Sequence, residues 1–197
     1  MIKSRLARLI NERKGQTVRI LSIAAGPAQE VFELLEERET LPCQLEIVLF
    51  DQDKRALSFS FGRLQRLVTS RFRDQVTVRH LHDSIRHLLR GTTVFSGAGT
   101  FDAVYSCGLF DYLQLPTAVS LSRSLFELVS PGGTLYVGNM VPSNPCRWFM
   151  ELHLEWFLVY REREQMLDFA RMAAPQAEIE LLEEQTRVNP FVTLTRT

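Results

Sequence analysis

The chain has 197 residues, of which 45% are hydrophobic and 23% are charged, values typical of an ordinary globular protein of one domain. Lysine and arginine together number 23, and aspartate and glutamate also number 23, so the formal net charge is zero. This balance excludes a general electrostatic attraction to nucleic acid or to an anionic membrane, and we predict neither as a partner.

The cysteines and the N-terminal segment narrow the class of protein further. Cys43, Cys107 and Cys146 are widely spaced, with neither metal-ligand spacing nor the pattern of a disulfide framework. We therefore expect no metal site and a reducing, cytoplasmic location. Residues 1–16 predict an amphipathic charged helix rather than a signal peptide, and no stretch of the sequence reaches the roughly 18 apolar residues that span a bilayer.

From residue 17 onward, segments typical of strands and helices alternate. Apolar and β-branched runs predict five strands, at residues 17–24, 44–50, 75–81, 101–107 and 134–140. Helical patterns follow the first four strands, at residues 28–38, 53–68, 84–91 and 117–133, the last ending at a Pro-Gly-Gly sequence. Strands one, two, four and five are apolar almost throughout, which indicates burial on both faces and a parallel sheet.

The end of the chain follows a different pattern. Residues 146–164 are aromatic and predict one long helix, and residues 164–174 predict another. Residues 177–185 and 191–197 then predict two strands joined by a turn, which implies an antiparallel strand at the edge of the sheet. We predict an α/β fold of one domain, residues 1–197, with a doubly wound, Rossmann-like, mostly parallel sheet and an antiparallel C-terminal strand. Residues 141–175 are the candidate for an aromatic lid.

Polar residues stand at the carboxyl ends of the predicted strands, where ligands bind in such sheets. Gly26 opens the first strand-to-helix turn, and Asp51 follows 25 positions later, at the distance where an acidic residue commonly binds a ribose diol. Asp83 and Ser84 suit an adenine edge. Each also has a simpler interpretation: Asp51 or Asp53, and Asp83 or Ser84, could cap the helix that follows.

The glycine turn discriminates between cofactors. A nicotinamide dinucleotide site needs further glycines to approach the pyrophosphate, and here Ala24 and Ala28 stand in their places. S-adenosylmethionine (SAM) has no phosphate, so alanines are compatible with it. A nicotinamide-dependent oxidoreductase is therefore the less favoured alternative.

Four segments, "ILSIAAGPAQE", "LFDQD", "FDAVYSCGLFDYL" and "GGTLYVGNMVPSNPCRWFMELHLEWFLVYRERE", resemble class I SAM-dependent methyltransferases. More narrowly, the chain is similar to the bacterial group linked to the methyl ester of 3-hydroxypalmitic acid, an extracellular quorum-sensing factor. The resemblance covers residue 17 to the C-terminus, and it implies SAM as cofactor, with S-adenosylhomocysteine as product. The sequence departs from the general pattern of the class in two places: Ser22 stands where an acidic residue is common, and the outer glycines of the turn are missing.

The resemblance also implies a set of cofactor-binding residues. Ala24, Ala25 and Gly26 line the methionine end, and Asp51 binds the ribose. Glu30 either supplies a polar contact or only favours a helix N-terminus. The set is completed by three residues around the adenine and three at the end of strand four: Gln52, Asp83 and Ser84, and Ser106, Cys107 and Gly108.

The acceptor is expected beside the "GLFDYL" segment. Tyr112 is a candidate to contact the acceptor, Asp111 is either a base or a cap, and Asn139 is either an orienting donor or a turn former. A carboxylate acceptor is already ionised and needs no base, which accommodates a site without an obvious catalytic His/Asp pair. With the resemblance, this leads us to expect a small apolar acceptor, such as the carboxylate of a hydroxy fatty acid. Candidate acceptor-binding residues come from the aromatic segment: Arg147, Trp148, His153, Trp156 and Tyr160.

Three questions stay open from the sequence alone. Phe149, His153, Trp156 and Tyr160 share one face of the predicted helix, which is either a lid or a stripe facing the core. Arg161 is an alternative to Arg147 for holding a carboxylate. A catalytically inactive methyltransferase-like domain is the rival function, and the partners beyond a small-molecule acceptor, a homodimer or a further domain, are undecided.

Overall fold

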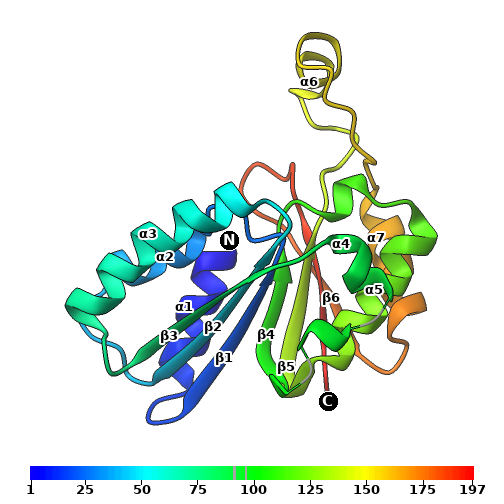
Figure 1. Cartoon of the computed structure of the whole chain (residues 1–197). Coiled ribbons are helices and arrows are strands. Elements are labelled where there is room, and N and C mark those ends of the chain that lie inside the picture. Colours follow the sequence, from blue (N-terminus) through cyan, green and yellow to red (C-terminus); the bar gives the residue numbers. More distant parts are fainter. Residues whose placement is uncertain (91, 96) are drawn as a thin grey trace.

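The computed structural model describes residues 1–90, 92–95 and 97–197. Its centre is a seven-stranded sheet in the order β3-β2-β1-β4-β5-β7-β6 (Figure 1). The strands are β1 (Thr17–Ile23), β2 (Gln44–Asp51), β3 (Val76–His82), β4 (Phe101–Ser106), β5 (Val129–Gly138), β6 (Glu178–Leu182) and β7 (Phe191–Thr195). The first five pair in parallel, and β7 is antiparallel to both of its neighbours. The predicted fold class is confirmed.

Helices cover both faces of the sheet. One face carries α1 (Ile2–Glu12), α2 (Gln29–Glu36) and α3 (Lys54–Arg71), and the other carries α4 (Ile85–Arg90), α5 (Leu115–Glu127) and α7 (Arg163–Ala173) (Figure 1). Two short 3-10 turns, η1 (Thr92–Phe95) and η2 (Phe110–Tyr112), flank β4, and a last helix, α6 (Arg147–His153), stands apart from the body. The helical segment expected after the third strand ends at residue 91, which lies outside the described residues.

Two expectations about the edges of elements were wrong. The helix after β4 ends at Glu127, because the Pro-Gly-Gly sequence belongs to an irregular start of β5, where the pairing register with β4 shifts. The antiparallel strand is also not at the edge. The apolar strand β7 is buried between β5 and β6, whereas the polar β6 takes the edge, because an inner strand must be apolar on both faces.

Each parallel strand ends at the same edge of the sheet, which gathers the candidate residues. The turns after β1, β2, β3 and β4 all open there, above the two apolar cores that hold the helices against the sheet. In the described part of the chain, no helix is both long and apolar enough to cross a membrane.

Candidate functional site

The turn after β1 has an unusual backbone. Ala24, Gly26 and Ala28 have φ values of 53°, 53° and 50°, so every second residue is in the left-handed region. Glycine adopts that region freely, whereas alanine does so at a cost. The two alanines therefore stand in a backbone that glycine would favour, which the sequence indicated by their spacing. A Cβ added to Gly26 would meet no atom within 4 Å, so the turn faces open space.

Asp51 fixes this turn from the end of β2. Its Oδ2 accepts a hydrogen bond from the Gly26 N–H at 2.6 Å, and its Oδ1 accepts one from the Asp53 N–H at 2.7 Å. Asp53, not Asp51, caps α3, since its carboxylate accepts from the N–H groups of Arg55 and Ala56. Each Asp51 oxygen keeps a second lone pair, so the buried carboxylate can still accept hydroxyl groups.

A pocket opens between the ends of β2 and β3. Gln52, Asp83 and Ser84 line it, as the adenine prediction requires, together with residues that the sequence did not single out: Asp53, Lys54, Arg55 and His82. The Asp83 carboxylate accepts from the Ser84 N–H and contacts His87 Nδ1, both at 2.6 Å. These bonds, the Ser84 N–H first, lower the pKa of Asp83.

Ser84 also has the capping role that the sequence left open. Its Oγ accepts from the Arg86 N–H at 3.2 Å, at the start of α4. The hydroxyl hydrogen is not used in that bond, so capping does not prevent Ser84 from donating to a ligand.

Beneath the glycine turn, Glu30 contacts a residue that the sequence analysis missed. The Tyr105 hydroxyl donates to Glu30 Oε1 at 2.6 Å, and Tyr105 is fully buried in β4. Burial, followed by the Glu30 charge, raises the pKa of Tyr105 well above its usual value. A buried tyrosine needs a hydrogen-bond partner for its hydroxyl, and a tyrosine within a strand expected to be buried was the signal that the sequence offered.

The end of β4 faces the same region. Ser106 is buried, and its Oγ has no hydrogen-bond partner among the described residues. Burial raises the pKa of Cys107 to about 12, so this residue stays a neutral thiol at physiological pH. A Cβ added to Gly108 would meet nothing within 4 Å, so open space lies beyond β4 as it does at Gly26.

The loop after β4 places Asp111 inside the protein and Tyr112 outside. Asp111 is 3% exposed, and its Oδ1 accepts from the Met140 N–H at 2.7 Å. Burial raises its pKa from 3.8 to about 6, against the opposing effects of the Met140 N–H and the Arg161 charge. The side chain thus ties η2 to the end of β5 and caps no helix. Tyr112 is exposed, and its hydroxyl accepts from Trp156 Nε1 at 2.7 Å.

Arg161 and Asn139 form a buried brace behind this loop. The Arg161 guanidinium donates to the carbonyls of Phe110 and Leu113 and to the Asn139 side-chain oxygen. Asn139 Nδ2 donates to the carbonyls of Met140 and Val159, at 3.0 and 2.9 Å. Both amide hydrogens of Asn139 are therefore engaged within the chain, and the Arg161 charge is directed at backbone oxygens.

The expected long helix over residues 146–164 was wrong. α6 ends at His153, Glu155 has a φ of 50°, and the chain from there to Glu162 returns without regular structure. Because the left-handed residue breaks the helix, Phe149, His153, Trp156 and Tyr160 do not share one helical face. The alternative of a stripe facing the core was also wrong, since Phe149, His153 and Trp156 are exposed.

Instead, residues 143–158 form an arm that extends away from the body (Figure 1). Within it, His153 stacks on Phe149 with ring centroids 5.1 Å apart, and Trp148 lies edge-on to both rings. Arg147 pairs with Glu151 at 2.8 Å, and its guanidinium lies 4.6 Å from the centre of the Tyr160 ring. The structure thus brings Trp156 to Tyr112 and leaves Trp148 and His153 at a distance from the body.

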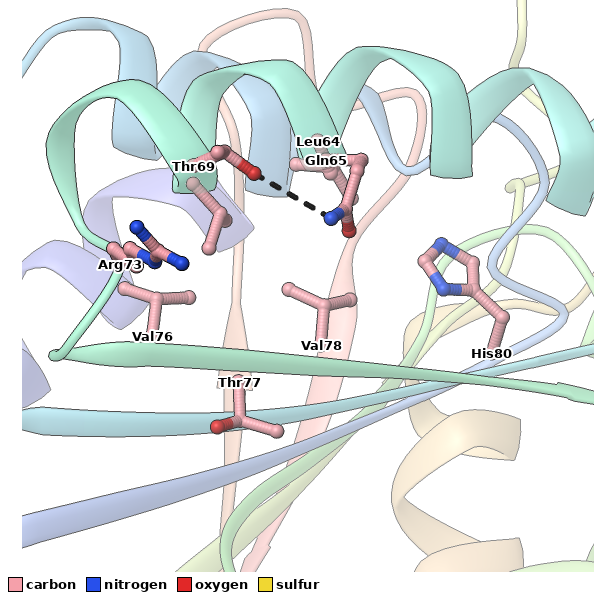
Figure 2. A pocket seen from close by; sticks show the side chains of 9 residues that line it. Leu64, Gln65, Thr69, Arg73, Val76, Thr77, Val78 and His80 are labelled. Atoms are coloured by element: carbon pink, nitrogen blue, oxygen red, sulfur yellow. Dashed lines mark hydrogen bonds between the residues drawn. The ribbon is translucent and has the colours of Figure 1, made fainter.

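Two other cavities can be compared with the predicted site, one at the arm and one at the edge of the sheet. One, of about 270 Å³, is at the root of the arm and is lined by Leu115, Tyr160, Arg161, Met172 and neighbouring residues. The other, of about 380 Å³, lies between α3 and the edge strand β3 (Figure 2). There Val76 and Val78 point from β3 toward α3, Val76 toward Thr69 and Val78 toward Gln65, and none of the predicted site residues lines it. Among the described residues, no group of His, Cys, Asp or Glu side chains could hold a metal ion.

Comparisons with known proteins match the fold. No protein-family model and no curated protein matches the chain. A Bordetella parapertussis structure described as a possible exported protein is similar over 99% of this chain, with 17% identity and a TM-score of 0.72. An O-methyltransferase family protein from Burkholderia thailandensis is similar over the whole chain, at 14% identity and a TM-score of 0.62. This chain spans 67% and 56% of those two structures.

A third structure is an enzyme with its product bound. The magnesium protoporphyrin IX methyltransferase of Synechocystis, solved with S-adenosylhomocysteine, is 9% identical, has a TM-score of 0.67, and is covered over 81% of its length. At such identities the comparisons show a shared fold. The chain therefore has the fold found in SAM-dependent methyltransferases.

Proposed function

We propose that the protein is a SAM-dependent methyltransferase that acts on a small apolar acceptor. The observation that carries this proposal is the Asp51 carboxylate, which bridges the Gly26 turn and the start of α3 beside the pocket of Gln52, Asp83 and Ser84. This arrangement offers acceptors for a ribose diol next to a polar pocket for a purine. Methyltransferases among the structures of the same fold support it.

The residues present fit the cofactor along its length. Ala24, Ala25 and Gly26 would face its methionine end, with open space at Gly26, and Glu30 bonds to Tyr105 beneath this turn. At the end of β4, Ser106 has an unsatisfied hydroxyl, Cys107 a neutral thiol and Gly108 open space. When bound, SAM supplies a methyl group on a sulfonium, which a nucleophile displaces in line.

On the acceptor side, we expect the residues of the chain to position the acceptor and to exclude water from it. Tyr112 accepts a hydrogen bond from Trp156, so its own hydroxyl hydrogen is free to donate to an acceptor oxygen. Asp111 and Asn139 hold the loop rather than contact the acceptor, because both are buried and engaged. Methyl transfer to a carboxylate needs no base, so we propose a hydroxy fatty acid carboxylate as the first acceptor to test. The cavity beside Tyr160 would take part of an apolar tail.

Calorimetric titration tests the cofactor site directly. We expect SAM and S-adenosylhomocysteine to bind, and Asp51→Ala to weaken both by about 1.5–3 kcal/mol through the loss of charged hydrogen bonds. Glu46→Ala is the matched control: it removes a carboxylate of the same strand, β2, that pairs with Arg19 away from the carboxyl end, and it should leave affinity nearly unchanged. Absence of binding in a folded sample, or equal losses in the two variants, would contradict the proposal.

A turnover assay separates the enzyme from an inactive relative. Incubation with SAM and a panel of 3-hydroxy fatty acids, phenols and amines should give methylated product with at least one class, the acids first. Cofactor binding without product across the panel would favour a binding domain without catalysis, which the alanines in the turn would then explain. Binding of a nicotinamide dinucleotide in place of SAM would establish the oxidoreductase alternative.

A further inference from the structure

The arm, residues 143–158, exposes more large apolar surface than any other described segment. Leu152 is 75% exposed, Phe157 68% and Trp148 59%, and Phe149, Leu154 and Trp156 are exposed beside them. From the size of such side chains, the six together present roughly 700 Å² to water, close to the ~800 Å² that each partner buries in a stable protein interface. Apolar patches of this size mark contact surfaces.

The chain's own body does not cover this surface. The irregular segment after α6 is attached to the body by two backbone hydrogen bonds: the Val159 N–H donates to the Asp111 carbonyl at 2.7 Å, and the Arg161 N–H donates to the Met140 carbonyl at 3.1 Å. The Trp156–Tyr112 bond adds a third attachment. With the root fixed in this way, α6 is directed away from the sheet (Figure 1).

The charges of the arm indicate what covers it. Arg147 and Glu151 pair within α6, His153 stacks on Phe149, and Glu155 is the remaining charged side chain. The arm is therefore close to neutral, with a slight excess of negative charge. Anionic lipid and nucleic acid both require a basic surface, so neither fits. A neutral, strongly apolar surface instead suits a homodimer, whose interfaces are more apolar than those of transient complexes.

We infer that the arm is the contact surface of a homodimer, in which the arm of each copy packs against the arm of a second copy about a two-fold axis. In such an interface the same patch is used twice, so each aromatic side chain that needs cover also provides it. Pairing also accounts for the helical conformation of α6. A helix of seven residues is not stable alone in water, and a partner arm supplies the missing packing.

The chain carries its own reporter for this contact. Its two tryptophans, Trp148 and Trp156, both lie in the arm, so intrinsic fluorescence reports arm burial without any label. We expect sedimentation velocity to show a dimer at high micromolar concentration. Dilution should convert the dimer to a monomer and shift the tryptophan emission to longer wavelength over the same concentration range. A monomer at every concentration would overturn the inference.

Matched variants locate the contact. Leu152→Asp combined with Phe157→Asp should give a monomer at all concentrations, with a circular dichroism spectrum and melting curve close to those of the parent. Phe59→Asp combined with Phe61→Asp is the control, because Phe59 is 57% exposed and Phe61 is exposed beside it on α3, far along the chain from the arm. This control should remain a dimer.

Two results would assign the arm another role. A dimer that persists in the arm variant, or is lost in the control, would place the contact elsewhere. Monomeric parent protein that sediments with phosphatidylcholine vesicles, and loses this binding in the arm variant, would make a lipid surface the occupant. Either result overturns the homodimer.

Discussion

The two ends of the proposed site are built by different means. On the cofactor side, Asp51 at the end of β2 holds the Gly26 turn through the Gly26 N–H, and this turn follows the adjacent parallel strand β1. On the acceptor side, Arg161 reaches back 51 residues to Phe110 and 48 residues to Leu113, and fixes a loop that has no strand to support it. The first end follows from the sheet topology, whereas the second depends on one buried side chain from a distant segment.

This difference has a consequence for stability. Removal of a side chain on the cofactor side leaves the carboxyl ends of the strands in place, because the strands are paired along their whole length. Removal of the acceptor-side brace leaves several buried polar groups without partners at once, and such groups are costly. We therefore expect the acceptor side to be the part of the site most sensitive to substitution.

The largest effect is expected from Arg161→Met. The substitution removes three hydrogen bonds and leaves Asp111 without its nearby positive charge, which should lower the free energy of unfolding by about 3–5 kcal/mol. Urea unfolding measures the loss. Arg163→Met, two residues away, removes an exposed ion pair with Glu183 and should cost less than about 1 kcal/mol. Equal costs in the two variants would show that the loop does not depend on the brace.

A second effect of similar origin is expected in the pH dependence of stability. Because burial raises the pKa of Asp111 to about 6, the folded protein retains a proton that the unfolded chain has already lost. This contribution is complete below about pH 4 and is lost as the pH rises through about 6, and a shift of about two units corresponds to about 3 kcal/mol. Asp111→Asn removes the titration, so its stability relative to the parent should increase across this interval.

The control for this experiment has the opposite sign. The pKa of Asp83 is lowered, so its contribution is present above the ordinary aspartate range and is lost as the pH falls. Asp83→Asn should therefore lose stability relative to the parent as the pH rises, by a small amount because the side chain is partly exposed. If the difference in unfolding free energy between Asp111→Asn and the parent does not change between about pH 4 and pH 8, burial does not raise the pKa of Asp111.

The same contrast explains what the sequence could predict. The order of strands one to five, the Asp51 position and the polar strand ends follow from period and spacing, because the residues involved lie at the ends of predictable elements. The aromatic segment did not follow. Its helical pattern continues through residue 160, but Glu155 adopts a left-handed conformation, and no local signal announces it. The roles of Arg161 and Tyr105 also depend on contacts across the fold, which spacing does not encode.

The smallest expected effect concerns the glycine turn, and it tests whether the cofactor side is as well determined as its topology suggests. Ala24 has a φ of 53°, where an L side chain is strained, whereas its neighbour Ala25 is not in the left-handed region. Ala24→Gly should relieve that strain and raise the free energy of unfolding by about 0.5–1 kcal/mol, after the greater flexibility of the unfolded chain is taken into account.

Ala25→Gly adds the same flexibility without relief of strain, so it should lower the free energy of unfolding by about 0.5–1 kcal/mol. Each variant removes one methyl group. A left-handed turn requires that the two changes in the free energy of unfolding, measured side by side in urea, have opposite signs. If both variants lose stability equally, Ala24 is not strained in solution. The turn would then have a different backbone, and the Gly26 N–H would no longer be directed at Asp51 by the alternation of left-handed residues.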